Sequence, residues 1–231
     1  MRYIFAGNEN FHDEVAMRLA NAGFDRCTDV DVAEAVITYC TSQSALEDLY
    51  FDEGGFVQAA NPGTLLVDFS ASTPGFAREL GSVATVSDLG FVEAPLVVSD
   101  MLDARPFDRE NLTAYVAGEE DAIVAAQPVL DAMVESVVSC GAAGTAQLAR
   151  AVKTLQVAAS VVSAIEANAL VAAAHRAALG NGLSDVVVSG LTEEAESMLA
   201  AVRQKRFEGA YTAEMFLSEL QAALAAADDA D

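Results

Sequence analysis

The sequence predicts an α/β fold, in which a mostly parallel sheet covered by helices is followed by a smaller, all-helical domain with one long helix. Two observations support this prediction. Short apolar runs typical of buried strands alternate with helical patterns through the first half of the chain. The strand signals then stop, and a long run rich in Ala, Val and Leu follows. We therefore divide the chain into residues 1–144 and residues 145–231.

Each expected element of the α/β part has its own signal. The expected strands are apolar runs bounded by turn residues, at residues 3–6, 36–40, 65–69, 85–87, 91–93, 113–117 and 137–140. The expected helices have apolar residues at helical spacing, at residues 13–22, 44–50 and 73–80 and after Gly118. In this last helix one side carries Ile123, Val124, Val129, Leu130 and Met133. Gly23 is placed to end the first helix, and residues 61–64 form a Pro-Gly turn. Ligands are expected at the carboxyl ends of the parallel strands.

The helical part begins with one long helix over residues 145–179, ended by Gly180 and Gly182, and continues with helices at residues 192–205 and 212–227. So long and apolar a helix needs burial on more than one side, which predicts an interdomain seam or a homodimer through this helix. Its most apolar stretch, residues 155–174, is interrupted by polar residues, so a buried helix is favoured over a membrane span.

The composition excludes several kinds of partner. Asp and Glu number 35 against 12 Lys and Arg, and the net charge of −23 repels nucleic acid and anionic lipid. The most basic stretch, residues 203–206, is interpreted as a solvated helix face. We expect no nucleic-acid partner and no membrane.

The cysteines and histidines indicate no metal site. Cys27, Cys40 and Cys140 are odd in number and have no CxxC spacing, so neither a disulfide framework nor a zinc site is predicted. His12 and His175 stand in no metal-ligand spacing, and surface or capping roles are expected for them. With no signal-peptide pattern at the N-terminus, a cytoplasmic location is expected.

Several segments resemble a known enzyme family. Residues 61–70 (NPGTLLVDFS), then Thr73, Pro74 and residues 77–80 (AREL), resemble a segment of the β-hydroxyacid dehydrogenases, which include 3-hydroxyisobutyrate and 6-phosphogluconate dehydrogenases. Residues similar to further family segments are 91–95 (FVEAP), 113–133 (TAYVAGEEDAIVAAQPVLDAM) and 141–153 (GAAGTAQLARAVK). The resemblance covers nearly the whole chain, although several C-terminal helices of a full-length member are missing. It implies a Rossmann-type NAD(P)-binding domain, a helical C-terminal domain, often a homodimer, and hydride exchange between NAD or NADP and a 3-hydroxy or imine-like small molecule.

The cofactor motif that this resemblance implies is incomplete. The dinucleotide fingerprint needs three glycines, and the matching positions are Phe5, Gly7 and Asn10. Glu9, Asp13 and Glu14 lie where the helix N-terminus would otherwise attract phosphate. The candidate cofactor-binding residues are Gly7, Asn8, Asn10, Thr41 and Ser70.

The ribose-reading part of the motif is also shortened. Only residues 24–33 separate Gly23 from Glu34, so the second strand is short and its crossover helix is at most one turn. Asp25 or Arg26 is a candidate to imitate the ribose-reading residue, although neither has a full βαβ unit around it.

The catalytic positions that the resemblance implies are changed as well. The family's acid/base lysine matches Arg150, and its asparagine one turn later matches Lys153. Either these two have exchanged roles, with Lys153 supplying the proton and Arg150 holding an anionic substrate, or both are ordinary helix residues. The family's Ser-Gly-Gly substrate loop reads Val97-Val98-Ser99, which leaves Ser99 as the candidate substrate residue. Ser218 stands where the family often has a further lysine.

Three functional hypotheses follow. The first is a family member that has lost cofactor binding and catalysis and acts as a binding or scaffold protein. The second is an active NAD(P)-dependent oxidoreductase that uses Lys153 on a small hydroxy acid or imine. The third is a subunit whose long helix pairs with a full-length, active relative.

Overall fold

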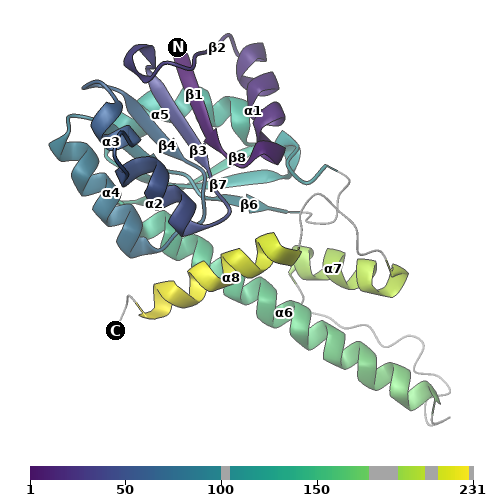
Figure 1. Cartoon of the computed structure of the whole chain (residues 1–231). Coiled ribbons are helices and arrows are strands. Elements are labelled where there is room, and N and C mark those ends of the chain that lie inside the picture. The colour runs from purple at the N-terminus through teal and green to yellow at the C-terminus, as the bar shows by residue number, and fades with distance from the viewer. Residues whose placement is uncertain (100–104, 177–191, 206–212, 229–231) are drawn as a thin grey trace.

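The computed structural model describes residues 1–99, 105–176, 192–205 and 213–228, and it confirms the predicted α/β fold followed by a helical region (Figure 1). The mixed sheet has eight strands in the order β2-β1-β3-β4-β5-β7-β6, with β8 on the other edge of β7. The strands are β1 (Arg2–Gly7), β2 (Asp25–Arg26), β3 (Ala35–Tyr39), β4 (Leu65–Asp68), β5 (Gly90–Glu93), β6 (Leu96–Val98), β7 (Leu112–Gly118) and β8 (Ser136–Gly141). The strands from β2 to β5 are parallel, and β7 runs antiparallel to β5 and β6.

Helices cover both faces of this sheet. Because successive strand residues point to opposite faces, Ile37 and Val67 join a core with α1 (Glu9–Asn21) and α5 (Glu120–Met133). Val36 and Leu66 join a second core with α2 (Gln43–Phe51) and α4 (Pro74–Val86). A short helix, α3 (Phe56–Ala59), and two 3-10 turns, η1 (Val30–Val32) and η2 (Arg109–Asn111), complete the described α/β part. Two buried layers fix the sheet and thereby the ends of its strands.

The turn signals predicted at Gly23 and at residues 61–64 are confirmed, and α4 begins with a cap that was not predicted. Gly23 has a φ of +81° just after α1, and Gly63 has a φ of +87° in the turn before β4, conformations that glycine adopts without strain. Thr73 caps α4 by accepting a hydrogen bond from the Phe76 amide, and Pro74 occupies the first turn. Local sequence therefore sets these element boundaries.

Two predictions for the α/β part are wrong. The expected strand at residues 85–87 is the last turn of α4 and its C-cap, where the Thr85 hydroxyl donates to the Gly81 carbonyl. The β-branched residues there favour a strand, but burial of Leu80 and Ala84 against the sheet carries the helix further. The second wrong prediction concerns α5, where Val124 was expected on the apolar side of the helix. It is 68% exposed, and the buried positions of that side include Ala122 and Ala126.

The shortened second crossover is confirmed. β2 has two residues, which pair with Arg2 and Tyr3, and only the turn η1 stands between it and β3. The Glu34 amide donates to the Arg2 carbonyl, so the chain enters β3 directly beside β1. The connection from β2 to β3 therefore contains no α-helix.

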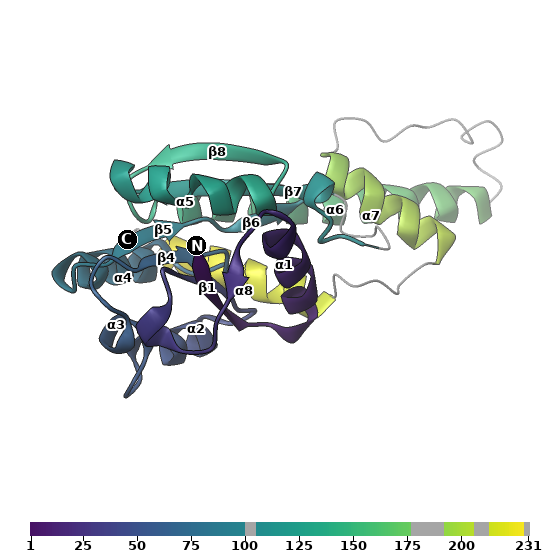
Figure 2. The same ribbon diagram turned by 90° about the horizontal axis from the view of Figure 1, so that it is seen from above.

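The helical part consists of α6 (Thr145–Arg176), α7 (Glu193–Gln204) and α8 (Ala213–Asp228), with α7 and α8 both packed on α6 (Figures 1 and 2). Residues 177–179, Gly180 and Gly182, where the long helix was expected to end, lie outside the described residues. The expectation that α6 is buried is wrong for the single chain, because only 28% of its most apolar window is buried. Residues 145–170 are long and apolar enough to cross a membrane, which by itself is weak evidence for a span.

Candidate functional site

An open crevice lies at the carboxyl ends of β1 and β3, the topological switch point where the strand order reverses. Connections from β1 lead to β2 on one side and, after η1, to β3 on the other, which is where ligands of α/β sheets bind. The crevice has a volume of about 490 Å³ and is lined by Gly7, Asn8, Cys40, Thr41, Ala45, Asp48 and Leu49. Three of the predicted cofactor residues, Gly7, Asn8 and Thr41, thus lie together. The only charged lining residue is Asp48, a carboxylate.

Gly7, which matches a glycine of the dinucleotide fingerprint, is required by the packing of two strands. Its φ is +126°, and an added Cβ would lie 2.7 Å from the Tyr39 carbonyl carbon and closer still to the carbonyl oxygen. That oxygen accepts a hydrogen bond of 2.7 Å from the Asn8 amide. No side chain fits at position 7 whether or not a ligand binds.

Phe5, at the first glycine position, belongs to an aromatic cluster beneath the crevice. Its ring is packed edge-to-face on Phe11 and His12, with centroids 6.3 and 5.7 Å apart. Phe11 in turn contacts Tyr39 and Phe107. This cluster fills the space under the start of α1 with side chains. Asn10 lies in the first turn of α1, and the placement of its side chain is outside the described residues.

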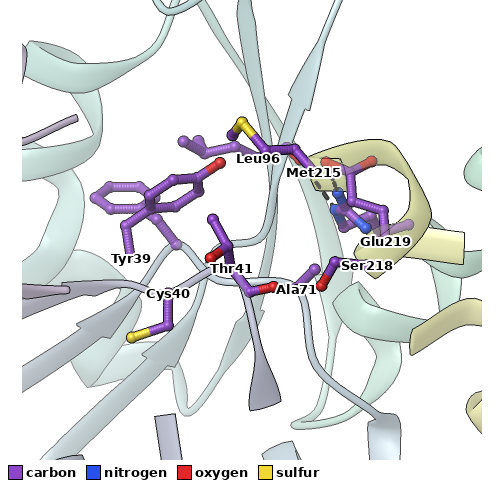
Figure 3. A pocket seen from close by; sticks show the side chains of 10 residues that line it. Tyr39, Cys40, Thr41, Ala71, Leu96, Met215, Ser218 and Glu219 are labelled. Atoms are coloured by element: carbon purple, nitrogen blue, oxygen red, sulfur yellow. Dashed lines mark hydrogen bonds and ion pairs between the residues drawn. The ribbon is translucent and has the colours of Figure 1, made fainter. Parts of the chain in front are cut away.

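The cleft between the sheet and α8 is closed by a buried ion pair. An Arg150 Nη lies 2.5 Å from a Glu219 carboxylate oxygen, and the two side chains are 5% and 15% exposed. The Arg150 Nε donates to the Leu96 carbonyl at 3.0 Å, and the Ser218 hydroxyl donates to the Thr41 carbonyl. Figure 3 shows Met215, Ser218 and Glu219 of α8 facing Tyr39, Thr41 and Leu96. The space left among these side chains is about 20 Å³, close to the volume of one water probe.

The electrostatics of this cleft are those of a closed core. Burial raises the pKa of Tyr39, and the nearby Glu219 carboxylate raises it further while Arg150 opposes. Burial also raises the pKa of Cys40 to about 12, so its thiol stays protonated and unreactive near neutral pH.

Arg150 and Lys153 also share a second, smaller space. With Val97, Val98 and Glu219 they line a cavity of about 10 Å³, together with Thr154 and Val157. Ser99, the candidate substrate residue, lines neither cavity. Its hydroxyl and its amide both approach the Asn111 carbonyl, at 3.3 and 2.9 Å. The structure therefore brings Arg150 and Lys153 together and leaves Ser99 in a backbone-bracing role.

Ser70 lies in a buried polar network. Its hydroxyl accepts from the Cys40 amide at 2.8 Å, and its own amide donates to Asp68 at 2.9 Å. The Thr38 hydroxyl donates to the same Asp68 oxygen and lies 2.8 Å from the Tyr50 hydroxyl. Burial raises the pKa of Asp68 to about 6 despite these hydrogen bonds. Ser70 thus joins β3 to β4 and is fully buried.

Glu93 lies beside Asp68 on the neighbouring strand and caps α6. One of its oxygens accepts from the amides of Gly144 and Ala146, at 2.6 and 3.1 Å, and the other is buried without a hydrogen-bond partner. Gln147 adds two further links, donating to the Ser70 carbonyl and accepting from the Ser72 amide. Burial raises the pKa of Glu93 to about 7, with Asp68 contributing.

Two important residues were missed by sequence reasoning: one in the cleft, Glu219, and one in the buried network at the start of α6, Glu93. Glu219 directly follows Ser218, which was singled out, but nothing local indicated that it reaches Arg150. Glu93 is in the recognised FVEAP segment, yet its role depends on where α6 begins. Among the described residues no group of three His, Cys, Asp or Glu could hold a metal ion.

Comparisons with known proteins identify the family of this fold. Residues 8–142, more than half of the chain, match the family model of the NAD-binding domain of 6-phosphogluconate dehydrogenase. The chain belongs to the β-hydroxyacid dehydrogenase family. Its sequence is 29% identical over 160 residues to a probable mitochondrial 3-hydroxyisobutyrate dehydrogenase of Dictyostelium discoideum, covering 69% of this chain and 48% of that protein. It is 33% identical over 135 residues to the mouse mitochondrial enzyme, covering 58% of this chain and 39% of that protein.

The chain thus spans about half the length, or less, of these curated family members. Among solved structures, 3-hydroxyisobutyrate dehydrogenase of Mycobacterium tuberculosis with L-serine is similar over 99% of this chain and 87% of that one. The TM-score is 0.73 at 20% identity, a likeness of fold.

Proposed function

We propose that this chain is a non-catalytic member of the β-hydroxyacid dehydrogenase family, which keeps the fold as a binding or scaffold protein in the cytoplasm. The observation that carries the proposal is the ion pair between Arg150 and Glu219, which fills the cleft between the sheet and α8. A site for even a small ligand needs roughly 300 Å³ or more, whereas about 20 Å³ is left here.

The chemistry at position 150 supports the same conclusion. An acid/base group must give up and take back a proton near neutral pH, and a guanidinium does not. The hydrogen bonds of Arg150 to Leu96 and Glu219 tie β6 to α8. Its role is that of a structural cross-link between the two parts of the fold.

The residues at the dinucleotide turn do not fit NAD or NADP. The glycine at position 7 is accounted for by strand packing, and a buried phenyl ring stands at position 5. The crevice presents Asp48 and no cation to a pyrophosphate. The two-residue β2 leaves no βαβ unit to hold the adenosine ribose. We therefore derive no hydride transfer, and a ligand of the crevice would be a small molecule without a pyrophosphate.

A homodimer through α6 is part of the proposal. The exposed apolar residues of this helix include Leu148, Val152, Leu155, Val162 and Ile165. Their spacing of three, four or seven residues places them along one side, as in a helix seam. Burial against a second copy would cover the apolar surface that the single chain leaves open. Pairing of α6 with a full-length relative would use the same surface.

The second candidate is an active oxidoreductase using Lys153. It is favoured by one observation: Lys153, Arg150 and Glu219 line the same small cavity, so an amine that can transfer a proton lies beside a guanidinium that can hold an anion. For this function α8 would have to move away from the sheet and open the cleft.

Calorimetric titration of the purified protein with NADH and with NADPH at low salt tests the proposal. We expect no heat of binding and no thermal shift with either. Binding that is retained by Lys153→Ala would contradict the loss of the cofactor site. The second candidate would be established by NAD(P)-dependent turnover of a small hydroxy acid or imine that Lys153→Ala abolishes. Lys205→Ala, which removes the same charge from the end of α7, is the control and should keep that activity.

A further inference from the structure

The two outer edges of the sheet differ in how they are protected. β2 has only two residues, Asp25 and Arg26, both charged and exposed. β8 has six residues without a charge, and its burial pattern is exposed at every position except Cys140. Natural sheets protect their edges with charge, proline or short length, because an open edge pairs with other strands. β2 follows this rule, and β8 does not.

β8 presents both backbone and apolar side chains to solvent. Val137 and Val138, which point to opposite faces, are 39% and 42% exposed. The Glu135 amide donates to the Leu112 carbonyl, so by alternation along a parallel ladder the N–H and C=O of Val138 point away from β7. The Val138 carbonyl accepts the Cys140 thiol of its own strand at 3.4 Å, a weak hydrogen bond that a backbone N–H can replace. In the described residues this outer edge pairs with no strand.

β8 carries no charged side chain, and the carboxylate that directly precedes it, Glu135, is ion-paired with Arg109. Residues 136–165 contain no Asp or Glu, although the whole chain has 35. These residues form β8 and most of α6. With a net charge of −23, two copies of this chain repel each other over most of their surfaces. A contact between copies is least opposed where acids are absent.

We propose that β8 pairs antiparallel with β8 of a second copy and continues the sheet across a two-fold axis at Val138. On such an axis each Val138 faces its counterpart, so both outward backbone groups exchange hydrogen bonds and the two valines form a β-branched cross-strand pair. The uncharged edge of β8 offers no attraction to a charged partner. A second copy fits this edge, because a two-fold axis requires only that the two paired strands be identical.

This contact is distinct from the one proposed through α6. A six-residue strand edge buries less than the roughly 800 Å² per partner typical of a stable interface. The β8 contact therefore adds to the helix contact and does not replace it. Two different two-fold contacts on one chain generate a closed tetramer when their axes intersect at right angles, and we propose this arrangement here. In this respect the inference rests on the proposed homodimer, while the β8 contact is independent of whether a cofactor binds.

Native mass spectrometry and light scattering across a concentration series test the inference. We expect the wild-type chain of 24.1 kDa to reach a tetramer. Val138→Lys should stop at the dimer held by α6. Val162→Lys should fall to the monomer at low concentration, because the β8 contact alone is smaller than a stable interface. Val124→Lys, on the exposed side of α5, should match the wild type. An unchanged mass for Val138→Lys would overturn the inference, and so would a wild-type dimer that Val162→Lys abolishes and Val138→Lys leaves intact.

Hydrogen exchange on the wild type provides a readout that needs no variant. The Val138 amide should be protected at high protein concentration and should exchange freely on dilution, while the amides facing β7 stay protected at both. Equal, rapid exchange of the Val138 amide at both concentrations would sink the β8 contact. NADH binding would remove the proposed function and leave this result standing.

Discussion

Glu93→Gln should make the protein more stable at pH 8 and should reduce the dependence of its stability on pH. Glu93 is fully buried, and its second oxygen has no hydrogen-bond partner. The buried Asp68 carboxylate contributes to the raised pKa of Glu93. Glu93 in turn contributes to the raised pKa of Cys140 in β8. The amides at the start of α6 stabilise the ionised form, but burial outweighs them. Glutamine retains the oxygen that accepts from Gly144 and Ala146 and removes the charge.

The expected magnitude follows from proton linkage. Folding raises the pKa of Glu93 from 4.5 to about 7, so between these two pH values the folded state binds more protons than the unfolded state. The contribution of this bound proton to the unfolding free energy is fully present below pH 4.5 and is lost as pH rises through 7. At 1.4 kcal/mol for each pH unit, this carboxyl lowers the unfolding free energy by at most about 3 kcal/mol over that range.

The assay is urea denaturation of wild type and Glu93→Gln at several pH values between 5 and 8.5. The difference in unfolding free energy between the two proteins should change by about 2 to 3 kcal/mol across this range in favour of glutamine at high pH. Glu120→Gln, on the exposed first turn of α5, serves as the control and should run parallel to the wild type. A Glu93→Gln curve parallel to the wild-type curve would refute the reasoning.

Two further predictions concern the cleft and the crevice. Glu219→Leu alone should lower the unfolding free energy by about 3 to 5 kcal/mol, because it leaves the buried Arg150 guanidinium unpaired. Arg150→Met combined with Glu219→Leu should recover most of that loss. A double-mutant cycle from urea denaturation measures the coupling energy, and additive losses of the two single variants would contradict the buried pair. Gly7→Ala should destabilise the protein by more than about 2 kcal/mol through its clash with the Tyr39 carbonyl and its φ of +126°; thermal melting without ligand checks this, and an unchanged melting temperature would mean that the glycine is kept for another reason.

Much of the fold could be predicted from the sequence because the signals are local. Turn glycines, the Thr73 and Thr192 caps and the alternation of apolar runs indicate where elements begin and end, and they act within a few residues. The short segment after Gly23 likewise limited what could stand between β1 and β3. The strand predicted at residues 85–87 failed because packing of α4 on the sheet outweighed a local preference for strand.

The candidate site could be predicted only in part. Sequence identified Gly7, Asn8 and Thr41 as neighbours, because the carboxyl ends of parallel strands meet at one edge of a sheet. The resemblance also matched Arg150 with the family's acid/base lysine, and from this match we predict no proton exchange there, because a guanidinium keeps its proton near neutral pH.

The partners of these residues were decided by the tertiary structure. Glu219 lies 69 positions after Arg150 and Gln147 lies 77 after Ser70, and no local pattern links residues so far apart. The state of Glu93 depends on how many amides reach it and how much water is excluded, which are properties of the packed interior. The sequence determined the family and most of the order of elements, although β6 and α3 were not predicted. Only the fold decided that α8 closes the cleft and that β8 remains an open edge, because long-range packing selects which surfaces are buried.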